Sequence, residues 1–178
     1  MKCILLISFA VLVLSGSAAY ADAAGSGLGK VNAQCRLAEP GPAVWVNVVG
    51  LKDRTGLLKM EVYPSVEGDF LGDDTNLVNA GKTFRRVEMP VPATGMVTLC
   101  TRLPGAGAYS IVVLHDRNAN HKFDKFSDGI GFSGNPKLHM RAPTAAETRW
   151  VANGGRGSMT IVMNYWHGFL SFGPVKGS

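Results

Sequence analysis

Short runs of alternating apolar and polar residues recur along most of the chain. The clearest is LLKMEVY at residues 57–63, in which every second residue is apolar. Successive side chains of a β-strand point to opposite faces, so this run predicts a strand with one buried face. Residues 44–49 alternate in the same way, and a polar turn at residues 52–56 separates the two runs. The pattern predicts a hairpin of these two strands.

Further strands are predicted at residues 83–89, 96–103, 108–115 and 158–165, separated by turns that contain Gly or Pro. The long polar connection before residue 83 has room for a helical turn at residues 66–71, but no window has the spacing of an amphipathic helix. The sequence therefore predicts an all-β fold, a single immunoglobulin-like β-sandwich of about seven strands with a long Asp/Asn-rich loop. The irregular spacing of the strands leaves a β-barrel as the structural alternative.

Residues 1–21 are typical of a secretory signal peptide. Lys2 precedes a short apolar run, and the small residues Ala19 and Ala21 mark a cleavage site. A retained anchor is the alternative, although the run is short for a bilayer span. Residues 22–43 are rich in Gly, Ala and Pro and predict a flexible arm, which leaves residues 44–178 for the sandwich. These features predict a periplasmic or secreted protein without a transmembrane segment in its mature form.

Charge adds little to this picture. Cleavage after residue 21 removes Lys2, so the net charge falls from the +5 of the full chain to +4. The basic residues are scattered, which indicates ordinary solubility charge and no nucleic-acid footprint. A mild positive charge also favours contact with anionic polymers of a cell envelope.

Two cysteines, Cys35 and Cys100, lie beyond the predicted cleavage site. Exported proteins with two cysteines usually pair them, and these two are too far apart for a CxxC redox or metal motif. We therefore predict a disulfide that ties the arm at Cys35 to a strand of the domain. Closing so long a loop would stabilise the fold by about 4 kcal/mol in the chain-entropy model.

The stretch from His115 to Pro136 departs from the strand pattern, because Asp and Asn recur at short intervals once the strand at residues 108–115 ends. A Ca²⁺ loop needs oxygen ligands that converge from a tightly turned backbone. The spacing predicts a structural Ca²⁺ loop at residues 116–128, with ligands from Asp116, Asn118, Asn120, the backbone carbonyl of Lys122, Asp124 and Asp128.

Two departures from a Ca²⁺ loop keep alternatives open. His121 stands where such a loop has glycine, and Ser127 stands where its last acidic ligand is expected. A turn rich in Asn and Asp also closes on its own backbone without an ion. A second alternative is a transition-metal site of His115 and His121 with Asp116.

Catalytic motifs are sparse. GFSGN at residues 131–135 lacks the second glycine of a nucleophile elbow, and the chain has no P-loop and no dinucleotide fingerprint. A hydrolase that uses His115 and Asp116 as a base–acid pair is the minor alternative to a non-enzymatic domain.

The aromatic tail beyond residue 164 has two interpretations. Tyr165, Trp166 and Phe169 are predicted as a ligand surface for a glycan or protein partner. The alternative is a final strand whose rings fold back onto the sandwich.

Residues 103–136 carry a resemblance to a known family. PGAGAYSIVVLHDRNANHKFD and the following DGIGFSGNP resemble the core and the GxGFSxN element of the bacterial family named domain of unknown function 2141. The resemblance spans about residues 44–165. It implies a small exported protein with a sandwich similar to transthyretin-like and collagen-adhesin B-type domains, which are mostly non-enzymatic. The family has no established activity.

Together these patterns predict an exported, non-enzymatic β-sandwich that serves as an accessory or binding domain. Its Ca²⁺ loop would hold the long connection at residues 115–136 and present it to a cell-envelope glycan or protein. The alternative is a metal-independent structural domain whose loop is held by its own hydrogen bonds.

Overall fold

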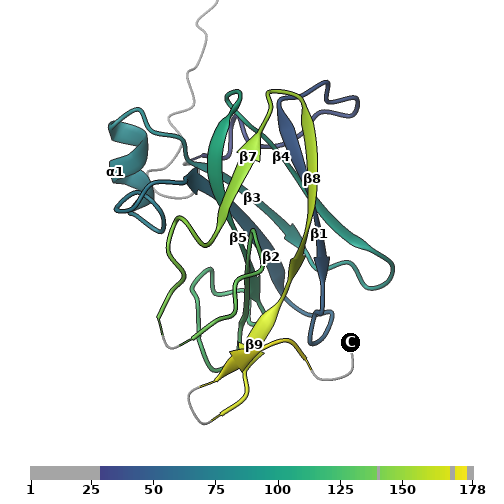
Figure 1. The fold of residues 1–178 in the computed structure, drawn as a ribbon. Helices are drawn as coiled ribbons and strands as arrows, with labels where there is room; N and C mark the ends of the chain where they lie inside the picture. Colours follow the sequence, from purple (N-terminus) through teal and green to yellow (C-terminus); the bar gives the residue numbers. More distant parts are fainter. Residues whose placement is uncertain (1–28, 140, 169–170, 176–178) are drawn as a thin grey trace, which may run out of the picture.

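The computed structural model describes residues 29–139, 141–168 and 171–175. Two β-sheets lie face to face with the main hydrophobic core between them (Figure 1). The small sheet has the order β4-β1-β8 and consists of β1 (Ala43–Val49), β4 (Val97–Arg102) and β8 (Arg156–Val162).

The large sheet has seven strands. Six follow the order β10-β9-β6-β5-β2-β3, and β7 pairs with the beginning of β5. The strands are β2 (Leu57–Pro64), β3 (Arg85–Pro90), β5 (Gly107–Asp116), β6 (Gly129–Phe132), β7 (Arg149–Ala152), β9 (Asn164–Trp166) and β10 (Phe172–Gly173). A short helix, α1 (Asp74–Asn79), lies in the connection between β2 and β3.

Alternation decides which face of each sheet is buried. Every second residue from 44 to 48 on β1 and from 58 to 62 on β2 is buried in the shared core. The two sheets remain separate, so the predicted all-β sandwich is confirmed and the barrel alternative is wrong.

The predicted hairpin of the first two strands is also wrong. β1 pairs with β4 and, in parallel, with β8, whereas β2 pairs with β3 and β5 in the other sheet. Residues 50–56 cross between the sheets. The crossing ends at Gly56, where φ is +74° and an added Cβ would lie 2.1 Å from the carbonyl oxygen of Asp116. Alternation shows which face is buried and not which strand is the neighbour, so it could not detect the crossing.

The described residues form ten strands, more than the sequence predicted. β6, β7 and β10 have four residues or fewer, too few for alternation to stand out. The run predicted at residues 158–165 is two strands: β8 ends in the small sheet at Val162, and β9 starts in the large sheet at Asn164. Residues 66–71 form a turn as predicted, and α1 follows with Asp73 as its N-cap.

The described part of the N-terminal arm is attached to the sandwich at several points. The predicted disulfide joins Cys35 to Cys100, with their Cα atoms 5.8 Å apart. The carbonyl of Ala33 accepts hydrogen bonds from the N–H of Arg102 at 2.7 Å and from the hydroxyl of Thr101 at 3.0 Å. The predicted signal peptide, residues 1–21, lies outside the described residues. No helix in the described ranges has the length and hydropathy needed to cross a membrane.

Candidate functional site

The Asp/Asn loop at residues 116–128 connects β5 to β6 and has two buried carboxylates at its base. Asp116 accepts hydrogen bonds from the backbone N–H groups of Asn120 at 3.2 Å and His121 at 2.6 Å. Asp128 accepts from the N–H groups of Arg117 at 3.1 Å and Asp124 at 2.8 Å. These carboxylates fix the loop because each satisfies backbone donors that the turn leaves without a strand partner.

The exposed part of the loop gathers the other predicted ligands. The side-chain oxygens of Asn118 and Asn120 each accept from the N–H two residues later, at 3.1 and 2.9 Å. Their amide nitrogens donate to one oxygen of Asp124, at 3.0 and 2.7 Å. These two hydrogen bonds hold the pKa of Asp124 below its usual value. The loop therefore brings the predicted ligand side chains together as hydrogen-bonding partners, while Lys122 contributes its N–H to Asn120.

Two further observations bear on cation binding. His121 has φ of +63°, the left-handed conformation that a Ca²⁺ loop requires at this position. Within the described residues, no group of three or more His, Cys, Asp or Glu side chains has an arrangement that could hold a metal ion.

His115 lies on the opposite side of β5 from Asp116 and points into the space between the sheets. Its side chain is buried, with Nδ1 2.7 Å from the Tyr165 hydroxyl and Nε2 2.8 Å from the Thr55 carbonyl. Because a carbonyl only accepts, Nε2 carries the proton, and the Tyr165 hydroxyl donates to Nδ1. That hydroxyl also accepts from the N–H of Lys52 at 3.0 Å.

Burial sets the protonation of this pair. It lowers the pKa of His115, against the raising effects of its Thr55 hydrogen bond and of nearby Asp53, and it raises the pKa of Tyr165 to about 12. Neighbouring residues of a strand face opposite ways, so the structure does not bring His115 and Asp116 together as a base–acid pair. It does not join His115 with His121 either, because the His121 ring lies beside Glu88, at 3.6 Å.

The GFSGN segment fastens strands to one another. The buried hydroxyl of Ser133 accepts from the N–H of Ile111 at 2.9 Å and donates to the Thr148 carbonyl. The side chain of Asn135 accepts from the N–H of Val162 at 2.8 Å and donates to the Thr160 carbonyl at 2.9 Å. Both side chains therefore tie the GFSGN segment to neighbouring strands.

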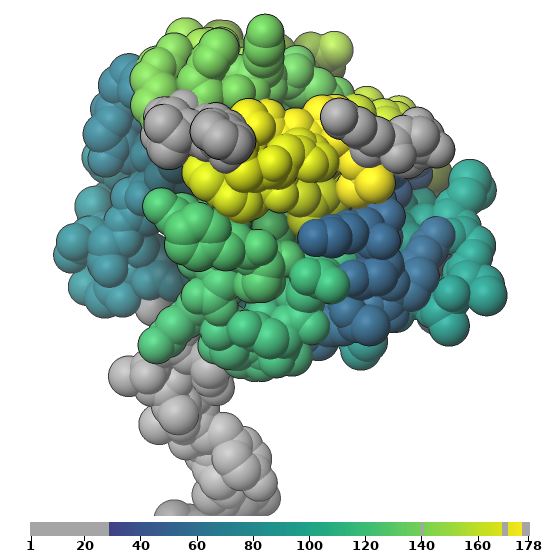
Figure 2. Space-filling view, turned by 90° about the horizontal axis from the view of Figure 1, so that it is seen from below, coloured from purple at the N-terminus to yellow at the C-terminus, as the bar shows by residue number. Residues whose placement is uncertain are grey.

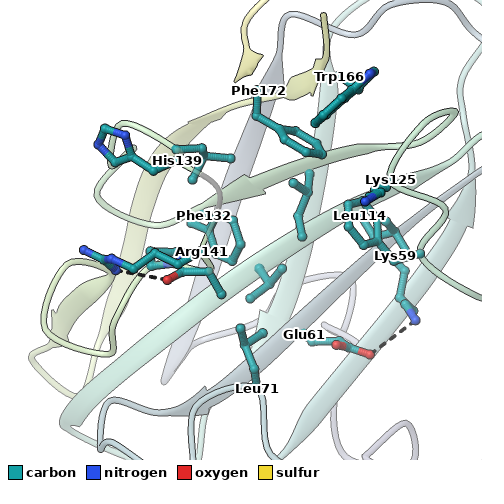
Figure 3. A pocket seen from close by; sticks show the side chains of 16 residues that line it. Lys59, Glu61, Leu71, Leu114, Lys125, Phe132, His139, Arg141, Trp166 and Phe172 are labelled. Atoms are coloured by element: carbon teal, nitrogen blue, oxygen red, sulfur yellow. Dashed lines mark hydrogen bonds and ion pairs between the residues drawn. The ribbon is translucent and has the colours of Figure 1, made fainter. Parts of the chain in front are cut away.

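A groove lies on the outer face of the large sheet, away from the small sheet. Its volume is about 420 Å³ (Figure 3). The floor is apolar and consists of Val112 and Leu114 from β5 and Ile130 and Phe132 from β6.

The walls of the groove come from segments far apart in the sequence. Figure 3 shows His139 and Arg141 on one side, Lys59 and Lys125 on the opposite side, Trp166 and Phe172 on a third, and Leu71 on the fourth. Seen end-on in Figure 2, the yellow C-terminal residues lie between the green Asp/Asn loop and the light-green segment that precedes β7.

The predicted aromatic ligand surface divides between the two faces of the sheet. Tyr165 is buried in the network with His115, so it is not a surface residue. Trp166 lines the groove and packs edge-to-face on Phe172, with ring centroids 5.6 Å apart. Phe169 lies outside the described residues.

Sequence reasoning missed the floor of the groove, although β5 carried a signal for it. AYSIVVLH at residues 108–115 is apolar at consecutive positions rather than at alternate ones. A strand that is apolar on both faces is covered on both faces. Val112 and Leu114 are the outer half of that run.

The fold and the site together define a two-sheet β-sandwich with an apolar groove on the outer face of its larger sheet. The chain belongs to the family described as "Uncharacterized protein conserved in bacteria (DUF2141)", whose model matches residues 46–159. The resemblance seen in the sequence is thus confirmed over most of the sandwich. The chain has no match among curated proteins or among solved structures.

Proposed function

We propose that this protein is an exported, non-enzymatic binding domain whose ligand site is the groove on the large sheet. The observation that carries the proposal is the groove itself: an apolar floor of four side chains, walled by aromatic and charged residues. Its volume of about 420 Å³ falls within the range of small-molecule sites, which are mostly apolar with a few polar groups at the edge.

The disulfide supports export. Disulfides persist in oxidising compartments, and Cys35 and Cys100 are within the Cα distance that such a bond requires. Together with the signal-like residues 1–21, this favours a periplasmic or secreted protein.

The surroundings of His115 support a non-enzymatic role. A general base must reach the proton that it removes, and both ring nitrogens of His115 are occupied inside the core. Ser133 is held in the same way by two backbone groups. His115, from the hydrolase alternative, and Ser133, from the GFSGN segment, therefore act as structural ties in this proposal.

Binding of a neutral apolar dye such as N-phenyl-1-naphthylamine tests the groove, because the dye fluoresces in apolar surroundings. Trp166→Ala and Phe123→Ala remove exposed parts of the wall and are expected to weaken dye binding about tenfold or more. Met96→Ala, at an exposed position outside the groove, is the control and is expected to leave binding unchanged. Equal binding by all these variants would exclude the groove as the site.

A structural Ca²⁺ ion in the Asp/Asn loop is a second candidate. The amide N–H groups of Asn118 and Asn120, rather than their oxygens, face Asp124, so the observation that favours the ion is the left-handed φ of His121. Its rival is a loop held by hydrogen bonds alone, since the buried carboxylates of Asp116 and Asp128 already have backbone donors.

Thermal unfolding separates these two candidates. A cation that binds only the folded state raises the unfolding midpoint by mass action. We expect millimolar CaCl₂ to raise the midpoint relative to EDTA, MgCl₂ of equal concentration to have less effect, and Asp124→Ala to abolish the rise. Asp124 is exposed, so this variant keeps the buried carboxylates that shape the loop. An unchanged midpoint, with no heat of Ca²⁺ binding by calorimetry, would identify the loop as metal-independent.

A further inference from the structure

We propose that the groove takes a single-chain amphiphile, with its aliphatic tail on the floor and a carboxylate head at the end marked by Lys125 and Lys59. A fatty acid is the simplest member of this class. The inference rests on the proposed function, that the groove binds an apolar ligand, and adds the chemistry of that ligand.

The floor selects for an aliphatic chain. Its four side chains are hydrocarbon only, and Val112, Leu114 and Phe132 are each exposed by 5% or less. A sugar would leave its hydroxyl groups unpaired on such a floor, which makes it a poor occupant. A flexible aliphatic chain gains from every methylene that it removes from water.

The walls suit the middle of such a molecule. Trp166 lies edge-to-face with Phe126 and with Phe172, at centroid separations of 5.4 and 5.6 Å. Phe123 is close to Phe172, at 6.4 Å. Trp166, Phe172 and Phe123 line the groove and give it an aromatic wall beside the apolar floor, against which an alkyl chain can pack.

Positive charge is concentrated at one end of the groove. Lys125 has no carboxylate partner among the described residues, and its Nζ lies 4.8 Å from the ring centroid of Phe126 and 5.8 Å from that of Trp166. Lys59 lies on the same side in Figure 3, and its nearest carboxylate is Glu61 at 3.6 Å.

Glu61 does not cancel this charge. Its Oε1 is already bound by Arg86, at 2.7 Å from Nη2 and 2.8 Å from Nε. Its other oxygen accepts the Tyr63 hydroxyl at 2.7 Å. The opposite wall is better balanced, because Glu147 holds Arg141 through two hydrogen bonds at 2.9 and 3.0 Å. An anionic head therefore complements the end with Lys125 more than the end with Arg141.

The test compares alkyl ligands below their micelle concentrations, by titration calorimetry and by the fluorescence of Trp166. Because each buried methylene contributes about fourfold in affinity, decanoate, with two more methylenes, is expected to bind about fifteenfold tighter than octanoate. Decanoate should also bind more tightly than decanol, and decyltrimethylammonium should bind more weakly than either. Trp45→Phe should keep the fluorescence response, and Trp166→Phe should lose it.

The charge part has its own variants. Lys125→Gln is expected to weaken decanoate binding about threefold and to leave decanol binding unchanged, while Lys125→Arg retains the wild-type affinity. Arg156→Gln makes the same charge change on the small sheet and is expected to have no effect.

The outcomes distinguish the two proposals. If decanol and decanoate bind equally, or if Lys125→Gln weakens the binding of both alike, the proposal of an anionic head group is wrong. The proposal that the groove binds an apolar ligand is then retained. If neither the alkyl ligands nor the neutral dye binds, both proposals are wrong. Binding to phosphatidylglycerol vesicles without binding to monomers would replace the amphiphile site with a membrane-docking surface.

Discussion

The two faces of the large sheet are both apolar, yet they are covered in different ways. The inner face packs against the small sheet, so its side chains meet other strands on every side. The outer face is covered by connections: the segment with α1, the residues before β7, the Asp/Asn loop and the tail. Connections cover a sheet less completely than a second sheet does, and the groove is the part that they leave open. In this molecule the inner face holds the fold together, and the outer face carries the groove that we propose as a binding site.

The largest expected effect comes from truncating a core residue on each face of β5. Ile111 on the inner face and Leu114 on the outer face have similarly low exposure. Ile111→Ala leaves a closed cavity and should cost about 4 kcal/mol of unfolding free energy. Leu114→Ala opens into the groove, so it should lose only the transfer term, about 2 kcal/mol. Urea unfolding of both variants measures the difference, and equal costs would show that the outer face is packed as tightly as the inner one.

A smaller effect concerns the polar pair of the inner face. Burial lowers the pKa of His115 in the folded protein, so below about pH 6.5 the unfolded chain binds a proton that the folded protein does not. Keeping His115 neutral therefore costs no free energy of unfolding above about pH 6.5. As the pH falls below this value, the free energy of unfolding decreases by at most about 1.4 kcal/mol per pH unit.

Unfolding between pH 5 and 7.5 measures this slope. His115→Gln is expected to flatten it, and His139→Gln, at an exposed histidine on the rim of the groove, is expected to keep it. A slope that survives His115→Gln would assign the titration to another group.

The smallest effect on the unfolding free energy is expected at the groove wall, where a substitution should change ligand binding more than stability. Phe123 is 44% exposed, so Phe123→Ala should lower the unfolding free energy by less than about 1 kcal/mol while it weakens dye binding. Parallel measurement of unfolding and binding checks this. A loss as large as that for Leu114→Ala would mean that the wall is part of the fold rather than a surface held ready for a ligand.

Much of the inner face could be predicted from the sequence, because alternation is a local property. The buried positions of β1 and β2 follow from it, and so does the two-sheet class. The pairing of strands does not, since the same alternation fits a neighbour in either sheet. The failed hairpin of β1 and β2 has this cause. β6 was not predicted because two of its four residues are glycines, which carry no apolar side chain to mark a strand. The glycine at 131 is required only in the assembled sheets, where an added Cβ would lie 2.5 Å from Ile161.

The outer site was harder to predict because it is assembled from distant segments. The loop motif identified Asp116, Asn118, Asn120, Asp124 and Asp128 as one unit, and the structure keeps them in one hydrogen-bonded loop. Of the aromatic residues predicted as a ligand surface, Trp166 lines the groove, whereas Tyr165 is buried, since neighbours on β9 face opposite sides of the sheet. No sequence pattern connects Lys59, Lys125 and Arg141, because these residues are far apart in the chain and only the fold places them around the same groove.

The parallel pairing of β1 with β8 has a consequence for the order in which the chain folds. Ala43 is the register partner of Arg102 on β4 and of Arg156 on β8, so the central strand of the small sheet completes its pairing only with a strand more than a hundred residues later. Contacts between such distant residues close large loops and slow folding. During synthesis, the domain therefore cannot close until nearly all of it has left the ribosome. For the export that we propose, this delay would keep the chain unfolded during its passage through a membrane pore.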